Sequence, residues 1–329
     1  MLSRALAFRP ASVVERLPPR SGACPLSARD LLGAAGPAGL VLPLVRAPIS
    51  GVARGALVAA KELRAVIGLG LPHGVPSRPW FDAVTRAADE LAAGVPIFLS
   101  ADLVVEGEGG TQVERAVSDA WRLVDDGLTH LAIDVAAVSP PERGRVVGEV
   151  ARAAFERGLS VEVVVPLGEG SRVGPRAAAL FDEVGRRGST PELAGVRCPA
   201  PADADEARMQ AAALARISQA LSGVPVMRRG PVTPRLLELL RASPVKACED
   251  GGAAAARAVD LVPVDLLGAE EGEQRASPLE RAAAELSDEA ADRLEARAYV
   301  EVLDFVERLG GRDGAPAVLR ALERSLEDR

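Results

Sequence analysis

Eight short apolar runs alternate with amphipathic stretches through the middle of the chain, and this alternation constrains the fold more than any other feature. The runs do not alternate strictly between apolar and polar residues, which is typical of strands covered on both faces. Eight strand–helix units over roughly 220 residues predict an α/β fold, the (β/α)8 TIM barrel. A doubly wound sheet is the alternative, but no glycine-rich dinucleotide loop follows the first strand. We expect strands at 39–45, 65–69, 96–100, 131–134, 160–165, 194–198, 225–228 and 245–248.

Two further segments flank the predicted barrel, which we place at residues 27–262. Residues 1–26 are rich in Pro and Arg and are expected to form a flexible N-terminal arm. Residues 277–329 predict a C-terminal helical extension of two helices, the first over 278–309. The second half of that helix carries an apolar stripe. This stripe either packs on the barrel of the same chain or forms a homodimer contact. Its members are Val300, Val302, Leu303, Val306 and Leu309.

Composition excludes several classes of protein. Hydrophobic residues make up 48% of the chain, which is ample for a packed core and excludes disorder. The formal charge of −7 argues against a nucleic-acid partner, because such proteins neutralise phosphates. No uncharged apolar run of roughly 18 residues predicts a membrane span. Three cysteines without CxxC spacing indicate neither a disulfide framework nor a zinc cluster, and the N-terminus lacks a secretory signal, so we predict a cytoplasmic protein.

Polar residues follow the predicted strands, at the end of a barrel where active sites are built. Carboxylates there can move protons, and guanidinium groups bind anions, so a small anionic or polyhydroxylated substrate is expected. The same residue types also cap helices or pair with each other, which is the alternative interpretation. The candidates are Arg46, His73, Asp102, Asp134, Glu162 or Glu169, Cys198, Arg228, Arg229, Glu249 and Asp250.

Several segments resemble one family in consistent order over roughly residues 27–259. The run Leu131-Ala-Ile-Asp-Val-Ala-Ala-Val-Ser139, the long helix pattern after it, and Gly158-Leu-Ser-Val-Glu162 are similar to class II fructose- and tagatose-bisphosphate aldolases. Ala93–Asp102 resembles the third strand of that family. Gly223–Gly230 and Val245–Asp250 resemble its seventh and eighth strands, and Ser27–Val45 its entry helix and first strand. The resemblance implies an aldolase-type barrel.

The metal-binding histidines of that family are missing from the matching positions. The family places a histidine directly after the aspartate that matches Asp102, where this chain has Leu103. Its seventh strand ends in His-Gly-Gly, where this chain has Arg228-Arg229-Gly230. Its sixth strand leads into Ser-His-Gly, where Cys198-Pro stands here. Only His73 lies near the expected rim, while His130 precedes the fourth strand. Zinc needs three or four such ligands, so we predict neither a metal nor another cofactor.

The resemblance also assigns roles to the residues that remain. Asp102 matches the proton donor of the family, Asp134 a structural or substrate-orienting aspartate, and Asp250 the aspartate of the last strand. We take these three as the catalytic candidates. We expect Arg46, His73, Arg228 and Arg229 to bind substrate. Arg228 stands where a metal ligand stood. It could stabilise a substrate oxyanion, or it could pair with Asp102 or Asp250 and plug the barrel mouth.

Three functional interpretations remain open, and the first has a variant. The first is a metal-independent carbon–carbon lyase or isomerase acting on a small, sugar-phosphate-like anion, which the convergent polar residues favour. A variant of it uses Lys246 as a Schiff-base nucleophile. The second is a catalytically inactive aldolase homologue with a binding, regulatory or scaffolding role. The third retains a divalent metal through the oxygen ligands Asp102, Asp134 and Glu162.

Overall fold

The computed structural model describes residues 6–71, 75–166, 173–188, 190–259 and 287–327. Within these ranges, eight parallel strands close into a barrel, because β4 pairs with β3 and β5, and β2 pairs with β9. A short ninth strand, β1, pairs in parallel with the start of β4. The strands are β1 Cys24–Pro25, β2 Leu42–Arg46, β3 Ile67–Leu71, β4 Pro96–Val104, β5 His130–Asp134, β6 Ser160–Pro166, β7 Leu193–Arg197, β8 Val226–Arg229 and β9 Ala247–Glu249. The predicted (β/α)8 barrel is confirmed.

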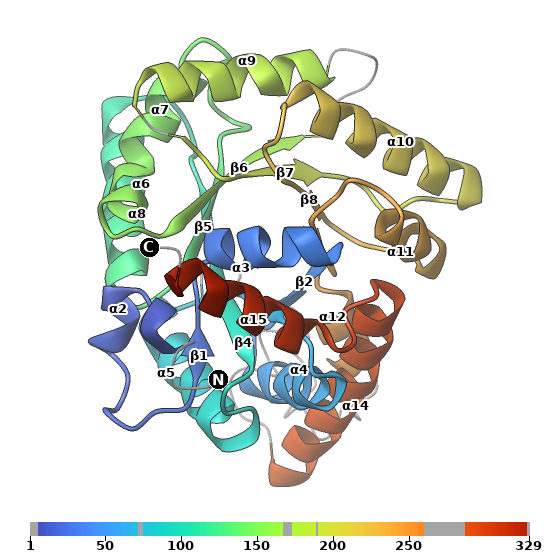
Figure 1. Ribbon diagram of the computed structural model, residues 1–329. Coiled ribbons are helices and arrows are strands. Elements are labelled where there is room, and N and C mark those ends of the chain that lie inside the picture. Colours follow the sequence, from blue (N-terminus) through green and yellow to red (C-terminus); the bar gives the residue numbers. More distant parts are fainter. Residues whose placement is uncertain (1–5, 72–74, 167–172, 189, 260–286, 328–329) are drawn as a thin grey trace, which may run out of the picture.

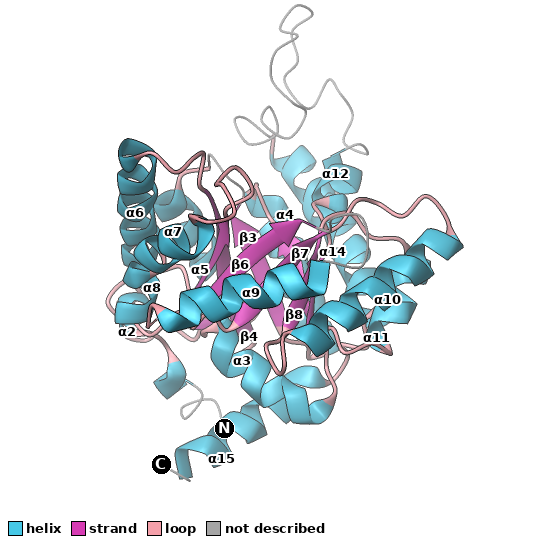
Figure 2. Cartoon of the chain, turned by 90° about the horizontal axis from the view of Figure 1, so that it is seen from above, coloured by secondary structure: helices cyan, strands magenta, loops and turns pink. Residues whose placement is uncertain are grey.

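Helices surround the strands, as Figure 2 shows. The wall helices are α4 Ser50–Leu63, α5 Ser77–Leu91, α6 Gly110–Asp125, α7 Arg143–Val150, α8 Arg152–Glu156, α9 Val173–Arg186, α10 Ala204–Ala220, α11 Pro234–Arg241 and α12 Ala253–Val259. Local sequence explains several of their starts. Asp203 accepts hydrogen bonds from the backbone of α10, and Thr233 accepts one from Leu236 N at the start of α11. The long helix that the sequence indicates after Ser139 is divided into α7 and α8 at Ala151.

The core has two parts. A large layer of Val, Leu, Ile and Ala side chains fills the space between the strands and the wall helices. A second cluster fills the amino-terminal end of the barrel interior, where Phe98 and Met227 meet α3 (Ala28–Ala35) and α15 (Gly314–Glu327). Figure 1 shows α3 and α15 side by side across that end. Gly68 makes room for Phe98, since a Cβ there would lie 2.2 Å from the Phe98 ring.

The N-terminal segment differs from the expected flexible arm. Its described part contains η1 (Leu6–Phe8), α2 (Ala11–Val14) and β1, and Val13 and Leu26 are buried. Asp89 Oδ1 accepts hydrogen bonds from the backbone N–H groups of Gly22 and Ala23. Apolar side chains and strand pairing therefore attach this segment to the barrel, which its Pro and Arg content does not indicate.

The C-terminal extension packs on the barrel of the same chain. The helix α14 (Asp288–Arg308) lies along α4 and also contacts α12. The side chains of Val302, Val306 and Leu309 in the predicted stripe are fully or almost fully buried, whereas Val300 is half exposed. The expected residues 277–286 fall outside the described part of the chain. None of the helices in the described ranges is long and apolar enough to cross a membrane.

Candidate functional site

Arg229 is the centre of a buried ion-pair network at the mouth of the barrel. It is the last residue of β8, and its side chain points into the barrel. Its Nε and Nη2 donate to the two carboxylate oxygens of Glu162 at 2.5 and 2.6 Å. Its Nη1 donates to Glu249 Oε2 at 2.8 Å and to Asp102 Oδ1 at 3.1 Å. One guanidinium group therefore holds carboxylates from β6, β9 and β4.

Arg46, the last residue of β2, completes the network. Its Nε donates to Glu249 Oε1 at 2.7 Å, and its Nη2 donates to Asp102 Oδ2. Asp102 and Glu249 each bridge the two arginines. The side chains of Arg46 and Asp102 are 20% and 16% exposed, whereas those of Arg229, Glu162 and Glu249 are almost completely buried. Three carboxylates thus face two guanidinium groups, and the solvent reaches the network at Arg46 and Asp102.

Glu162 continues the network down into the barrel. Its Oε2 lies 2.9 Å from His130 Nε2, and His130 Nδ1 lies 2.8 Å from Ser160 Oγ. Burial would raise the pKa of Glu162, but the charges and hydrogen bonds of Arg229 and His130 outweigh it and lower the pKa to about 2. Gly195 gives the pair its space, because a Cβ there would lie 1.8 Å from Glu162 Oε1. The Glu162 carboxylate is consequently ionised and fixed by its neighbours.

The other two catalytic candidates lie beside this network. Asp134, at the end of β5, pairs with the half-exposed Arg197 of β7 at 2.7 Å and accepts a hydrogen bond from Ala136 N. Asp250 follows β9 and accepts hydrogen bonds from the backbone N–H groups of Arg46, Gly252 and Ala254, each at 3.0 Å. Burial raises the pKa of Asp250 to about 6, against the lowering effect of these three donors. Asp250 therefore ties the end of β2 to the start of α12.

Two other candidates, Arg228 and Lys246, lie away from the network. Arg228 points to the opposite face of β8 from Arg229, is 0% exposed, and donates to the carbonyl oxygens of Pro199, Gly230 and Pro231. It joins the loops after β7 and β8 and pairs with no carboxylate among the described residues. Lys246 precedes β9, at the opposite end of that strand from the mouth. His73 lies outside the described residues.

Three residues of the observed network are not among the catalytic or substrate-binding candidates that the sequence indicates: Glu162, Glu249 and His130. Glu162 and Glu249 stand among the rim candidates, and Glu162 also as a metal ligand. Arg197, which pairs with Asp134 beside the network, is not among the candidates. His130 was expected at the far end of the barrel, yet its side chain reaches Glu162 from the first position of β5. The sequence does contain a signal for these positions, because residues two apart on a strand point to the same face. Ser160 and Glu162 lie on one face of β6, and Leu193, Gly195 and Arg197 lie on one face of β7.

The residues of the mouth do not fit the divalent metal that the resemblance implies. Within the described part of the chain, no three His, Cys, Asp or Glu side chains group so that they could hold a metal ion. The acids Asp102, Glu162 and Glu249 do converge, but the Arg229 guanidinium lies among them. A second cation there would be repelled by Arg229 and would have to displace its hydrogen bonds. In the oxygen set Asp102, Asp134 and Glu162, every carboxylate is paired with an arginine: Asp102 and Glu162 with Arg229, and Asp134 with Arg197.

The fold is that of known aldolase barrels. The chain is similar to the YdjI aldolase from Escherichia coli K12, with a TM-score of 0.61, 13% sequence identity, and coverage of 86% of this chain and 96% of that one. It is also similar to the fructose-bisphosphate aldolase of Campylobacter jejuni, with a TM-score of 0.60, 10% identity, and coverage of 87% and 94%. No family model and no curated protein sequence matches the chain. At these identities the likeness establishes the fold.

Proposed function

We propose that this chain is a divergent relative of the class II aldolases that keeps their barrel and acts by binding, in a regulatory or scaffolding role. The ion-pair network supports this proposal. Both arginines that point into the mouth are paired with carboxylates, and Asp102, the expected proton donor, is paired with both of them. Both carboxylate oxygens of Asp102 are occupied by these guanidinium groups, so a substrate would have to displace an ion pair to reach it. The carboxylates and guanidinium groups that could transfer a proton or bind an anion are therefore paired with each other.

An aldol-cleavage assay tests this proposal. The purified chain would be incubated with fructose 1,6-bisphosphate and with tagatose 1,6-bisphosphate, with and without added Zn²⁺, and triose phosphate release would be followed. We expect no release above the rate without protein, alongside an active class II aldolase as the positive control. Turnover that disappears in Asp102→Asn would overturn the proposal, because it would make Asp102 a working acid or base.

One observation favours a second candidate function, a metal-independent lyase or isomerase acting on a small anionic, sugar-phosphate-like compound. Asp102 and Arg46 are the members of the network with side chains open to solvent. In this candidate Arg46 holds the anion and Asp102 transfers the proton, with Asp134 and Asp250 beside them. Turnover of any sugar phosphate by the wild-type chain, and its loss in both Asp102→Asn and Arg46→Met, would support it. The Schiff-base variant would require borohydride-dependent labelling that is lost in Lys246→Ala.

Location and assembly belong to the same proposal. We place the protein in the cytoplasm, with a small anionic ligand at the mouth, no nucleic-acid partner, and a homodimer formed through the C-terminal helices. The described face of α14 that carries Val302 and Val306 is occupied by the chain's own barrel. A dimer would therefore use the outer face of α14, around the exposed Val300. Light scattering of the purified chain separates a dimer from a monomer of 34.1 kDa.

A further inference from the structure

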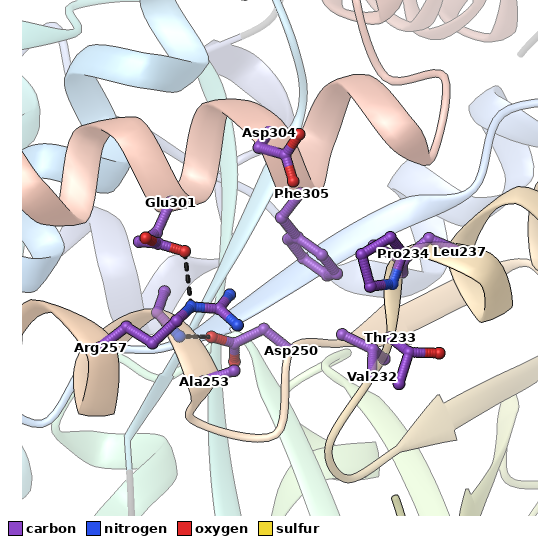
Figure 3. Close-up of a pocket in the computed structure, with 11 residues that line it drawn as sticks. Val232, Thr233, Pro234, Leu237, Asp250, Ala253, Arg257, Glu301, Asp304 and Phe305 are labelled. Atoms are coloured by element: carbon purple, nitrogen blue, oxygen red, sulfur yellow. Dashed lines mark hydrogen bonds and ion pairs between the residues drawn. The ribbon is translucent and has the colours of Figure 1, made fainter. Parts of the chain in front are cut away.

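A cavity of about 180 Å³ lies among three helices, outside the barrel mouth. The start of α11, the start of α12 and the second half of α14 form its walls, as Figure 3 shows. Neither Arg46 nor Arg229 is among the described residues that line it. An engineered protein cavity of about 150 Å³ holds one benzene molecule. The cavity therefore has room for a ligand the size of one substituted ring.

One side of the cavity is apolar. Phe305 of α14 points its ring into the space, opposite Pro234 and Val232 at the start of α11 (Figure 3). Phe305 is almost completely buried, and Leu237 beside it is buried as well. An aromatic face also attracts a cation that lies within about 6 Å of its centre. This wall favours a flat apolar group, and a cation can lie over the face of the Phe305 ring.

The polar side of the cavity carries three carboxylates, and two of them are already paired with arginines. Asp250, Glu301 and Asp304 are these carboxylates, and Arg257 is the guanidinium among the lining residues. Glu301 already accepts from Arg257 and Arg297, at 2.5 and 2.6 Å, and both oxygens of Asp304 accept from Arg308. The Asp250 carboxylate is occupied by three backbone donors.

Among the described residues, no cationic side chain pairs with Asp250, in contrast to the other two carboxylates. An ionised carboxylate offers about four acceptor positions, so one remains after the three backbone hydrogen bonds. The side chain is 2% exposed in the folded chain and lines the cavity. Burial raises the pKa of Asp250 to about 6, which means that the ionised form lacks compensation by a positive charge. A cationic ligand would supply that compensation.

We propose that this cavity binds a small primary amine that carries one aromatic or cyclic apolar group, with the ammonium group at Asp250 and the ring against Phe305. The ammonium group has three donors and matches the free acceptor position of Asp250. The ring fills the apolar side, and the Asp250 carboxylate, which is bound by backbone donors and not by a cation, favours a cation over an anion. The site shares Asp250 with the rim of the mouth, and its other lining residues belong to α11, α12, α14 and the loop before α11.

Benzylamine is the probe for this site. Isothermal titration of the full chain at pH 7.5 should give saturable binding of one benzylamine per chain. Benzyl alcohol and benzoate, which keep the ring but lack the positive charge, should bind at least about tenfold more weakly, as loss of a charge-assisted hydrogen bond implies. Equal affinity for the three compounds, or no saturation with benzylamine up to millimolar concentrations, would overturn the proposal.

Variants locate the binding to this cavity. Asp250→Asn should weaken benzylamine binding by roughly tenfold or more, and Phe305→Leu should weaken it severalfold by removing the ring. The control Glu289→Gln changes an exposed carboxylate in the first turn of α14 and should leave the affinity unchanged. If Asp250→Asn does not fold, Phe305→Leu and a pH series on the wild type decide the matter. Affinity should fall as the pH drops from 7 to 5, because Asp250 takes up a proton, and a constant affinity over this range would overturn the assignment.

Discussion

Arg229 determines the charge balance of the buried mouth. Its guanidinium contacts Glu162, Glu249 and Asp102, and the first two have almost no exposure to solvent. Removing one partner of a buried ion pair typically costs about 3–5 kcal/mol, because the remaining charge is uncompensated. We expect Arg229→Met to lower the free energy of unfolding at pH 7 by about this amount, measured by urea denaturation. The control Arg235→Met breaks an exposed pair with Glu238 and should change it by less than about 1 kcal/mol.

The same variant has a pH signature. In the wild type the pKa of Glu162 is lowered to about 2, so its contribution to stability is complete above about pH 4.5 and is lost as the pH falls toward 2. Without Arg229, burial becomes the main influence and raises the pKa of Glu162. The deficit of Arg229→Met should therefore shrink as the pH falls from 7 toward 4. A deficit that is constant over this range would contradict the assigned role of Arg229.

The pKa of Asp250 is shifted in the opposite direction from that of Glu162, so its effect on stability changes with pH in the opposite direction. Its pKa in the folded chain is raised to about 6 from 3.8, chiefly by burial, so folding favours the protonated form. Stability contributed by this group is therefore greatest below about pH 4 and is lost as the pH rises through 6, by on the order of 3 kcal/mol in total. Asp250→Asn removes this dependence. Urea denaturation should show that the free energy of unfolding of the wild type rises relative to that of the variant as the pH falls from 7 to 4.5. A constant difference between the two over this range would contradict the prediction.

At the scale of the elements, the sequence predicts the strands well and the direction of their side chains poorly. All eight predicted barrel strands overlap observed ones, because runs of Val, Ile and Leu bounded by turn residues are a local signal. The pointing direction depends on register, and a shift of one residue reverses it. Arg228 and Arg229 illustrate the consequence. Both were assigned to substrate, yet Arg229 points into the barrel and Arg228 points to the loops outside it.

The packing of α14 on α4 depends on one glycine. A Cβ at Gly55 would lie 2.5 Å from Glu295 O and 2.7 Å from Tyr299 N, both backbone atoms of α14 that cannot rotate away. Gly55→Ala should therefore separate the helices and lower stability by about 1–3 kcal/mol, although alanine favours helices. The matched control is Gly33→Ala in α3, where a Cβ meets nothing within 4 Å. Gly33→Ala should raise the free energy of unfolding by about 0.5–1 kcal/mol. Thermal unfolding of the two variants measures both effects. Equal effects would refute the close contact.

At the scale of the whole molecule, the C-terminal extension contributes side chains to the core of the barrel, so we expect the chain to need it for folding. The helices α14 and α15 bury seven large apolar side chains: Leu294, Val302, Phe305, Val306, Leu309, Val318 and Leu322. Burying one such side chain contributes about 1.5–3 kcal/mol, so together they contribute on the order of 10–20 kcal/mol before the cost of ordering the chain. The net stability of a whole domain is about 5–15 kcal/mol.

A chain that ends at residue 286 should therefore fail to fold, with loss of the cooperative thermal transition and of solubility. Apolar surface on α4 and α3 would be exposed at the same time, at the side and at the amino-terminal end of the barrel. Because the loss is one of contact surface, coexpression of the separate segment 287–329 should restore a soluble complex that unfolds cooperatively. The same segment with Leu294 and Val302 both changed to Asp serves as the control and should not restore it. A stable, soluble barrel from residues 1–286 alone would make the extension an appendage, and its apolar stripe would then be free for a second copy of the chain.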